Sequence, residues 1–252
     1  MHKYFANTLF IGKHVIYLPS CHSTNDMAAR LVPENKLFDG SVIITDHQTA
    51  GRGQRGNTWE AAPGKNLTFS VFLKPEFLEV ENQFYLNIVT SLGVCDFLNG
   101  YMGDEVSVKW PNDIYYRTNK MGGILIENSL RKGTIDTSIV GIGLNVNQTN
   151  FSIATATSMA MVCNQDFDLE ALTQELLKSL EHYYLRLKKG LYEQLREEYL
   201  NKLYWIGESR VFKSNGQFFP GEITGVDNIG RLLIETEAGK KAFNIKEVEF
   251  IK

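Results

Sequence analysis

The chain has 252 residues, 43% of them hydrophobic, and a formal net charge of −3. This length allows a sizeable core, in one large domain or in a large domain with a small partner. The charge excludes the generally basic surface that binds nucleic acid, and no apolar run is long enough to span a membrane. The cysteines, Cys21, Cys95 and Cys163, are widely spaced. They predict neutral thiols in a reducing cytoplasm rather than disulfides or a metal site.

The N-terminal part of the chain predicts a short helix and no signal peptide. Residues 1–18 include Lys13 and His14 and lack an apolar stretch followed by a cleavage site. Ser23–Val32, STNDMAARLV, begins with side chains that cap helices and continues with helix-forming residues up to Pro33.

A glycine-rich segment, TDHQTAGRGQRGNTW, occupies Thr45–Trp59. Its spacing G-x-G-x-x-G within Gly51–Gly56 is the one that binds dinucleotides when it joins a strand to a helix. A strand is predicted before it, at Ser41–Thr45, but Pro63 breaks any helix after it. Leu67–Leu73 then predicts a second strand. The order strand, loop, strand disfavours a nicotinamide or flavin site.

Two arginines, Arg52 and Arg55, lie among these glycines. Glycines allow backbone N–H groups to form a concave anion site, and guanidinium groups suit phosphate or carboxylate. The segment therefore favours an anion-binding loop over a solvated hairpin.

The rest of the chain predicts a mixed α/β domain followed by a small β domain. A helix is expected at Asn82–Tyr101, ending at Gly100, and a helical stretch from Asp168 to Leu203 is interrupted at Lys188–Gly190. Short strands separated by turn sequences follow after Ile206, typical of an SH3-like barrel. The expected domains are 1–204 and 205–252. Further strands are predicted at Val106–Trp110, Gly122–Asn128 and Asp136–Val146.

Three polar clusters accompany these strands. VKWPNDI, Val106–Ile114, is either a turn, which its spacing slightly favours, or a loop that presents Asp113 to a cation or nucleotide. Lys120 precedes Gly122 and Gly123, whose position predicts close backbone approach to a neighbour or ligand. GIGLNV, ending in Asn145 and Val146, is consistent with a glycine-rich strand packed on a neighbour.

Taken together, the motifs resemble the biotin protein ligase family, in the form without an N-terminal DNA-binding domain. The matching motifs, in the family's order, are STND (Ser23–Asp26), QTAGRGQRGNTW (Gln48–Trp59), KWPNDI (Lys109–Ile114), KMGGILIE (Lys120–Glu127) and GIGLNVN (Gly141–Asn147). The resemblance implies an α/β fold of the class II aminoacyl-tRNA synthetase type with a C-terminal SH3-like β domain. It also implies a ligase that adenylates biotin with ATP and passes biotin to one lysine of a biotin carboxyl carrier protein.

The resemblance further implies roles for individual residues. Biotin would contact Ser23, Thr24, Asn25, Gln48, Gly51, Arg52, Gly53, Gln54, Lys120 and Gly123. ATP or the adenylate would contact Arg52, Gln54, Arg55, Trp59, Lys109, Asn112 and Asn145. Lys120 and Arg52 would act in catalysis, and Asp113 would hold Mg²⁺. Several family members carry arginine at the position of Gln54, so a charged phosphate contact is lost there.

Partners and location follow from the same resemblance. We expect a cytoplasmic monomer or homodimer that binds biotin, ATP and the carrier protein but neither nucleic acid nor a membrane. The 22 residues before Ser23 are too few for the DNA-binding domain of repressor members. The alternatives are a lipoate–protein ligase or octanoyltransferase of the same fold, or a biotin- or DNA-binding regulator without turnover. The sequence leaves open which carrier is modified and whether Asp113 or Lys120 assists its lysine.

Overall fold

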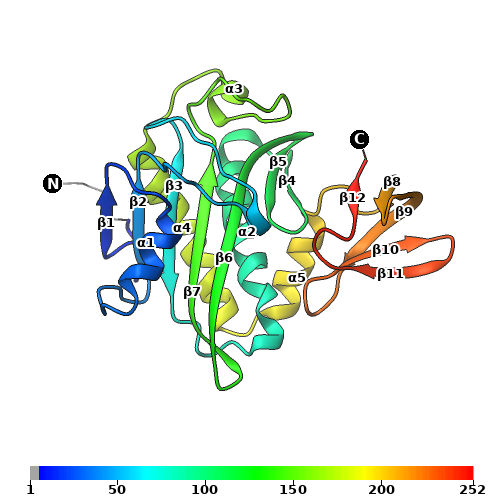
Figure 1. Cartoon of the computed structure of the whole chain (residues 1–252), viewed down its shortest axis with the longest axis horizontal. Coiled ribbons are helices and arrows are strands. Elements are labelled where there is room, and N and C mark those ends of the chain that lie inside the picture. Colours follow the sequence, from blue (N-terminus) through cyan, green and yellow to red (C-terminus); the bar gives the residue numbers. More distant parts are fainter. Residues whose placement is uncertain (1–5, 252) are drawn as a thin grey trace.

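The computed structural model describes residues 6–251, except for the side chain of Arg55. Within that range two sheets form, one of seven strands and one of five (Figure 1). The large sheet comes from the first part of the chain and the small one from its end, which confirms the mixed α/β fold with a C-terminal β unit. None of the described helices is long and apolar enough to cross a membrane.

The seven-stranded sheet is mixed. Its first two strands run parallel and all other neighbours run antiparallel. In spatial order the strands are β1 (Val15–Leu18), β2 (Ser41–Thr45), β3 (Leu67–Leu73), β7 (Thr134–Leu144), β6 (Asn119–Arg131), β5 (Asp113–Tyr116) and β4 (Val106–Lys109).

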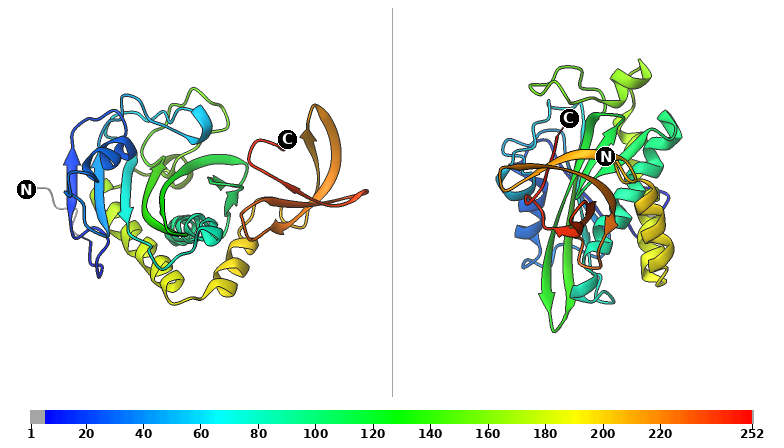
Figure 2. Two further views of the ribbon diagram at one scale, coloured as in Figure 1. Left: turned by 60° about the horizontal axis from the view of Figure 1, so that its bottom comes forward. Right: turned by 90° about the vertical axis from the view of Figure 1, so that its right-hand side faces the viewer.

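Helices cover both faces of this sheet, as the right-hand view of Figure 2 shows. One face carries α1 (Thr24–Leu31), and the other carries α2 (Phe84–Met102) and α4 (Leu169–Lys188). The remaining helices are α3 (Met159–Cys163), α5 (Tyr192–Asn201) and the 3₁₀ turns η1 (Gln54–Gly56) and η2 (Val80–Asn82).

The alternation of side chains along the strands explains why two helical layers form. In β2, Ile43 packs with Ala28 of α1, whereas Val42 and Ile44 belong to the larger core on the opposite face. Successive strand residues point to opposite faces, so a fully apolar strand needs cover on both sides. The run SVIIT is buried at every position, as the sequence predicts.

The C-terminal unit is an antiparallel sheet beside the β4–β5 end of the large sheet (Figure 1). Trp205, Phe212 and Phe250 form its aromatic centre. The indole N–H of Trp110 donates to the carbonyl of Gly230 at 2.9 Å, which joins the two units. In spatial order the strands are β11 (Gly239–Phe243), β10 (Leu232–Thr236), β9 (Gln217–Val226), β8 (Ser209–Ser214) and β12 (Glu249–Phe250).

The glycine-rich segment has the connection that the sequence predicts. It links β2 to β3, which run antiparallel, and its only helical turn is the 3₁₀ turn of three residues at Gln54–Gly56. A dinucleotide fingerprint requires a long helix at this point. The sequence did not predict the short strands β1, β5 and β12, the five-residue helix α3 or the 3₁₀ turn η2. Helix α2 also continues past Gly100 to Met102.

Candidate active site

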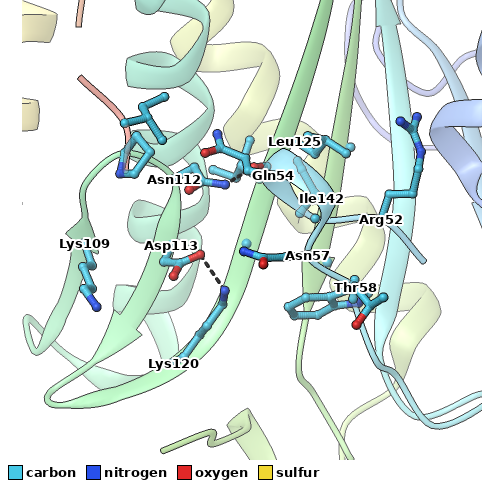
Figure 3. Close-up of a pocket in the computed structure, with 18 of the residues that line it drawn as sticks. Arg52, Gln54, Asn57, Thr58, Lys109, Asn112, Asp113, Lys120, Leu125 and Ile142 are labelled. Carbon is cyan, nitrogen blue, oxygen red and sulfur yellow. Dashed lines mark hydrogen bonds and ion pairs between the residues drawn. The ribbon is translucent and has the colours of Figure 1, made fainter. Parts of the chain in front are cut away.

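A cleft of about 650 Å³ opens over the start of β6 and the end of β7 in the large sheet (Figure 3). Five segments enclose it: the start of α1, the glycine loop, the turn after β4, the start of β6 and the segment 245–250, which ends with β12. Its lining includes Ser23, Thr24, Asn25, Gln48, Arg52, Gly53, Gln54, Trp59, Lys109, Asn112, Asp113, Lys120 and Gly123. Most of the residues expected from the sequence are therefore brought together.

One end of the cleft is a compact group of hydroxyl and amide side chains. Ser23 caps α1, and both Ser23 and Thr24 are buried. The backbone N–H and the hydroxyl of Thr24 both donate to the side-chain amide oxygen Oε1 of Gln48, at 2.7 and 3.2 Å. An isolated parallel β-bridge between Cys21 and Gln48 joins the segment before α1 to the segment before the glycine loop. The group offers uncharged donors and acceptors in a buried setting, where unpaired ligand atoms are costly.

The glycine loop folds back on itself beside this group. Trp59 N–H donates to the carbonyl of Gly51 at 2.9 Å, and Gly53 N–H donates to the carbonyl of Asn57 at 2.7 Å. A Cβ at Gly51 would lie 2.4 Å from the Trp59 carbonyl oxygen. Glycine is therefore required at this position by the close approach of the two backbone segments, and Gly51 stands behind the cleft rather than in its lining.

Trp59 rests on the floor of the cleft. A Cβ at Gly143 of β7 would lie 2.4 Å from the Trp59 ring. Gly141 leaves space for Asn25 in the same way, at 2.3 Å from its side-chain oxygen. The glycines of GIGLNV thus make room for neighbouring side chains, which is the packing interpretation given above. The indole nitrogen of Trp59 is buried without a hydrogen-bond partner.

Arg52 is fixed by carboxylates. Its guanidinium makes a bidentate pair with Glu127, at 3.0 and 2.8 Å, and lies 2.7 Å from Asp26. The hydrogen bonds to Glu127 raise the pKa of Arg52 above its ordinary value. Figure 3 shows its side chain directed away from the Asp113–Lys120 pair.

Lys120 and Asp113 form an ion pair of 2.6 Å on the opposite wall. Asp113 begins β5 directly after the turn that contains the cis bond Trp110–Pro111, and it is registered with Gly123 of β6. The backbone of Lys120 is held by bonds to Thr155 and Thr157. This arrangement supports both alternatives for VKWPNDI, because the segment is a turn that also presents Asp113 to the cleft.

Asn112 and Lys109 occupy the rest of this wall. The Asn112 amide donates to the carbonyl of Ile124 at 2.5 Å, which ties the turn to β6. The Lys109 ammonium lies 5.2 Å from the Tyr115 ring and 5.1 Å from the Phe250 ring. Burial raises the pKa of Tyr115 to about 12, so this phenol stays protonated near neutrality.

Two of the residues expected to contact the nucleotide, Asn145 and Arg55, are not among those that line the described cleft. Asn145 is buried outside the cleft lining, and its amide donates to the carbonyl of Thr157 at 3.0 Å. In this conformation Asn145 orders the segment that holds Lys120. The Arg55 side chain lies outside the described residues.

The sequence reasoning missed several residues around the cleft. Asp26 and Glu127 belong to the quoted motifs STND and KMGGILIE, but their pairing with Arg52 requires the fold. Ser70 of β3 contacts both Thr24 and Asn25. The segment 245–250 comes from the C-terminal unit and carried no motif.

Among the described residues, no three histidine, cysteine or acidic side chains gather to hold a metal ion. Asp113 is the carboxylate that the cleft presents near Lys120. Such a site suits Mg²⁺, which takes one or two protein carboxylates and completes its shell with phosphate oxygens and water.

Comparisons with known proteins agree with this geometry. Residues 17–145 match the model of the biotin/lipoate A/B protein ligase family. The bifunctional ligase/repressor BirA of Bacillus spizizenii is 28% identical over 98% of this chain and 77% of its own length. The biotin–[acetyl-CoA-carboxylase] ligase of Mycobacterium tuberculosis is 31% identical over 84% of this chain and 80% of its own.

A solved structure extends the likeness to the whole fold. The biotin protein ligase of Aquifex aeolicus, determined in complex with biotin and ATP, superposes with a TM-score of 0.78 at 30% identity. The match covers 95% of this chain and 99% of that one. The fold and the cleft thus define an α/β protein ligase. This chain belongs to the biotin/lipoate A/B protein ligase family.

Proposed function

We propose that this chain is a biotin protein ligase. It activates biotin with ATP, releasing pyrophosphate, and transfers the biotinyl group from biotinyl-AMP to a lysine of a biotin carboxyl carrier protein. The observation that carries the proposal is a cleft in which an uncharged polar end, a glycine loop and a Lys–Asp pair lie together. The relatives, named as biotin ligases, favour biotin over lipoate as the acid.

The uncharged end suits the ureido ring of biotin. Ser23, Thr24 and Gln48 offer hydroxyl and amide groups, with Gly123 on the facing strand and Asn25 behind them. The ureido group has donors and a carbonyl acceptor in a small planar ring, so it can satisfy such groups without introducing charge. An acid that lacks these atoms would leave buried polar groups unpaired.

The charged part of the cleft suits the reacting groups. The biotin carboxylate and the α-phosphate are both anions, and negative charge grows on the phosphate oxygens as the new bond forms. The Lys120 ammonium would stabilise that charge, together with Arg52 and the backbone N–H groups of Arg52 and Gln54 in the glycine loop. Gln54 offers an amide but no charge. Trp59, Lys109, Asn112 and Arg55 are assigned to the nucleotide side, and Asn145 is assigned an indirect role through the segment that holds Lys120.

Mg²⁺ would accompany ATP in this reaction. Asp113 offers a carboxylate in the cleft, and the triphosphate would supply the other oxygens. When bound, the ion neutralises phosphate charge. The chain itself places the Lys120 ammonium 2.6 Å from the Asp113 carboxylate, so that both groups lie on one wall of the cleft.

The second half-reaction requires mainly positioning. The mixed anhydride is already activated, so the carrier lysine needs to lose a proton and approach the carbonyl carbon. Asp113 and Lys120 are the candidate groups for assisting it. Closure of the glycine loop over the intermediate would exclude water from the anhydride. We place the protein in the cytoplasm.

A transfer assay tests the complete function. The chain is incubated with ATP, Mg²⁺, biotin and a biotin carboxyl carrier domain, and intact mass is measured. The proposal predicts one added biotinyl group on a single carrier lysine, absent without ATP. A carrier that stays unmodified with biotin but gains a lipoyl group from lipoate would replace the proposal with the lipoate alternative.

A further inference from the structure

Glu127 contacts both Arg52 of the glycine loop and Asn25 of α1, and no role has been assigned to it so far. It lies on β6 four residues beyond Gly123 and closes the bidentate pair with Arg52. The same carboxylate accepts a hydrogen bond of 2.7 Å from the Asn25 amide. Two bonds to a guanidinium and one to a buried amide use most of the acceptor capacity of one carboxylate.

Asn25 is itself held from all sides. It is 3% exposed, its side-chain oxygen lies 2.6 Å from the Ser70 hydroxyl, and its amide also reaches the carbonyl of Leu125. The missing Cβ of Gly141 leaves the space that this oxygen occupies. Asn25 therefore presents Glu127 with a donor in a fixed position.

The charges around Arg52 suggest a local structural task. Its single positive charge faces two carboxylates, Glu127 and Asp26, so much of its attraction for a further anion is already balanced. These side chains are 39–51% exposed, and ion pairs in such positions contribute little to global stability. The bidentate geometry does fix direction, because a planar guanidinium fits a carboxylate in one plane.

We propose that Glu127 is a positioning residue: it holds the glycine loop through Arg52 and couples the loop to the start of α1 through Asn25. The inference rests on the proposed function for its substrate, biotin. Thr24 precedes Asn25 in α1 and is bonded to Gln48, which lies in the segment between β2 and the glycine loop. The carboxylate of Glu127 thus connects the polar end of the cleft to the loop that faces the reacting anions.

The loop needs such an anchor because of its composition. Gly51, Gly53 and Gly56 lose more backbone freedom on ordering than other residues would. An anchor made before the ligand arrives removes part of that entropy cost from binding. Loss of Glu127 should therefore raise the KM for biotin more than it lowers kcat, because the chemical groups themselves remain.

A double-mutant cycle tests the coupling. Glu127→Gln keeps the shape and one acceptor but removes the charge, and Arg52→Ala removes the partner. ATP–pyrophosphate exchange is measured as a function of biotin for both single variants and the double variant. Glu127→Gln should raise KM on the order of tenfold, the size of one lost charge-assisted hydrogen bond. The double variant should lose little more than Arg52→Ala alone, since coupled residues are non-additive.

Hydrogen exchange supplies a readout that does not depend on activity. The backbone amides of residues 51–59 should exchange hydrogen faster in unliganded Glu127→Gln than in the unliganded wild type, and the rate in Glu127→Asp should lie between the two. Glu105→Gln is the matched control, because Glu105 pairs with Arg117 through two bonds outside the cleft lining. That variant should leave KM and loop exchange unchanged.

Two results would overturn the positioning role. One is a double variant whose losses in kcat/KM are the product of those of the single variants. The other is unchanged exchange of residues 51–59 in Glu127→Gln. A wild-type protein without biotin-dependent ATP–pyrophosphate exchange would instead contradict the proposed function. Hydrogen exchange of residues 51–59 in the unliganded variants would still decide the role of Glu127.

Discussion

The Trp59 indole lies on the backbone of Gly143, so closely that a Cβ at residue 143 would be 2.4–2.7 Å from ring atoms. Real Cβ atoms do not approach other atoms so closely, so any larger residue at position 143 would require the Trp59 ring or the β7 backbone to move. Trp59 ends the glycine loop, and Gly143 belongs to β7 on the cleft floor. The absence of a side chain at Gly143 in β7 therefore fixes where the end of the glycine loop, at Trp59, can lie.

Gly143→Ala should therefore displace Trp59 and impair adenylation. We expect kcat/KM for biotin in pyrophosphate exchange to fall about tenfold or more, the scale of a small misplacement of reacting groups. Gly100→Ala is the control, because nothing lies within 4 Å of its added Cβ in α2. That variant should be as active as the wild type and slightly more stable. Equal activity of both variants would show that the Trp59 contact is irrelevant to the reaction.

Lys120→Ala should separate the two half-reactions. The ammonium is assigned to the oxygens of the carboxylate and the α-phosphate, so its loss should slow exchange by about 10²-fold or more. Biotinyl-AMP supplied synthetically should still pass its biotinyl group to the carrier at a measurable rate. Lys36→Ala, which removes a surface ion pair with Glu34, should change neither rate. Equal losses in both half-reactions would mean that Lys120 is not specific to adenylation.

Glu181 predicts a stability effect away from the cleft. Its buried carboxylate on α4 accepts the backbone N–H groups of Leu9, Phe10 and Ile11, at 2.6, 2.7 and 2.9 Å. Glu181→Ala leaves these donors without their acceptor and should lower the free energy of unfolding by about 2–4 kcal/mol. Urea denaturation measures the change, with exposed Glu197→Ala as control. A shift no larger than that of the control would contradict this anchoring role.

Alkaline pH should destabilise the fold through buried acids. Burial raises the pKa of Cys95 from 9.0 to about 12, and it raises that of Tyr183 from 10.0 to about 12. The unfolded chain ionises at the lower values, so the stabilisation is complete below pH 9 and is lost as pH rises toward 12. Urea midpoints should fall across this window. Cys95→Ala should weaken the dependence, and an unchanged slope would exclude Cys95 as a contributor.

Much of the fold is predictable because its signals are local. The run SVIIT and the cap at Ser23 each carry their structure in neighbouring residues, and β2 and α1 formed where expected. Strand β1 was not predicted, because it is a short, half-buried strand that depends on pairing with β2. Strand β5 follows a proline turn, and the sequence shows the turn more clearly than the four residues after it.

The site divides in the same way. Arginine and glycine in GRGQRG indicate an anion-binding loop, and the structure brings that loop to the cleft. The partners of Arg52 depend on contacts across 26 and 75 residues, to Asp26 and Glu127, which no local pattern encodes. The packed position of Asn145 was likewise beyond reach, since it follows from the segment that folds over Lys120.

ATP–pyrophosphate exchange by the purified chain, with one acid at a time, tests directly whether biotin is the acid that is adenylated. Radiolabelled pyrophosphate, ATP and Mg²⁺ are incubated with biotin, lipoate or octanoate, and label entering ATP is measured. A biotin protein ligase should give exchange with biotin and none above background with the other two acids. Exchange driven by lipoate or octanoate and not by biotin would contradict the proposed function.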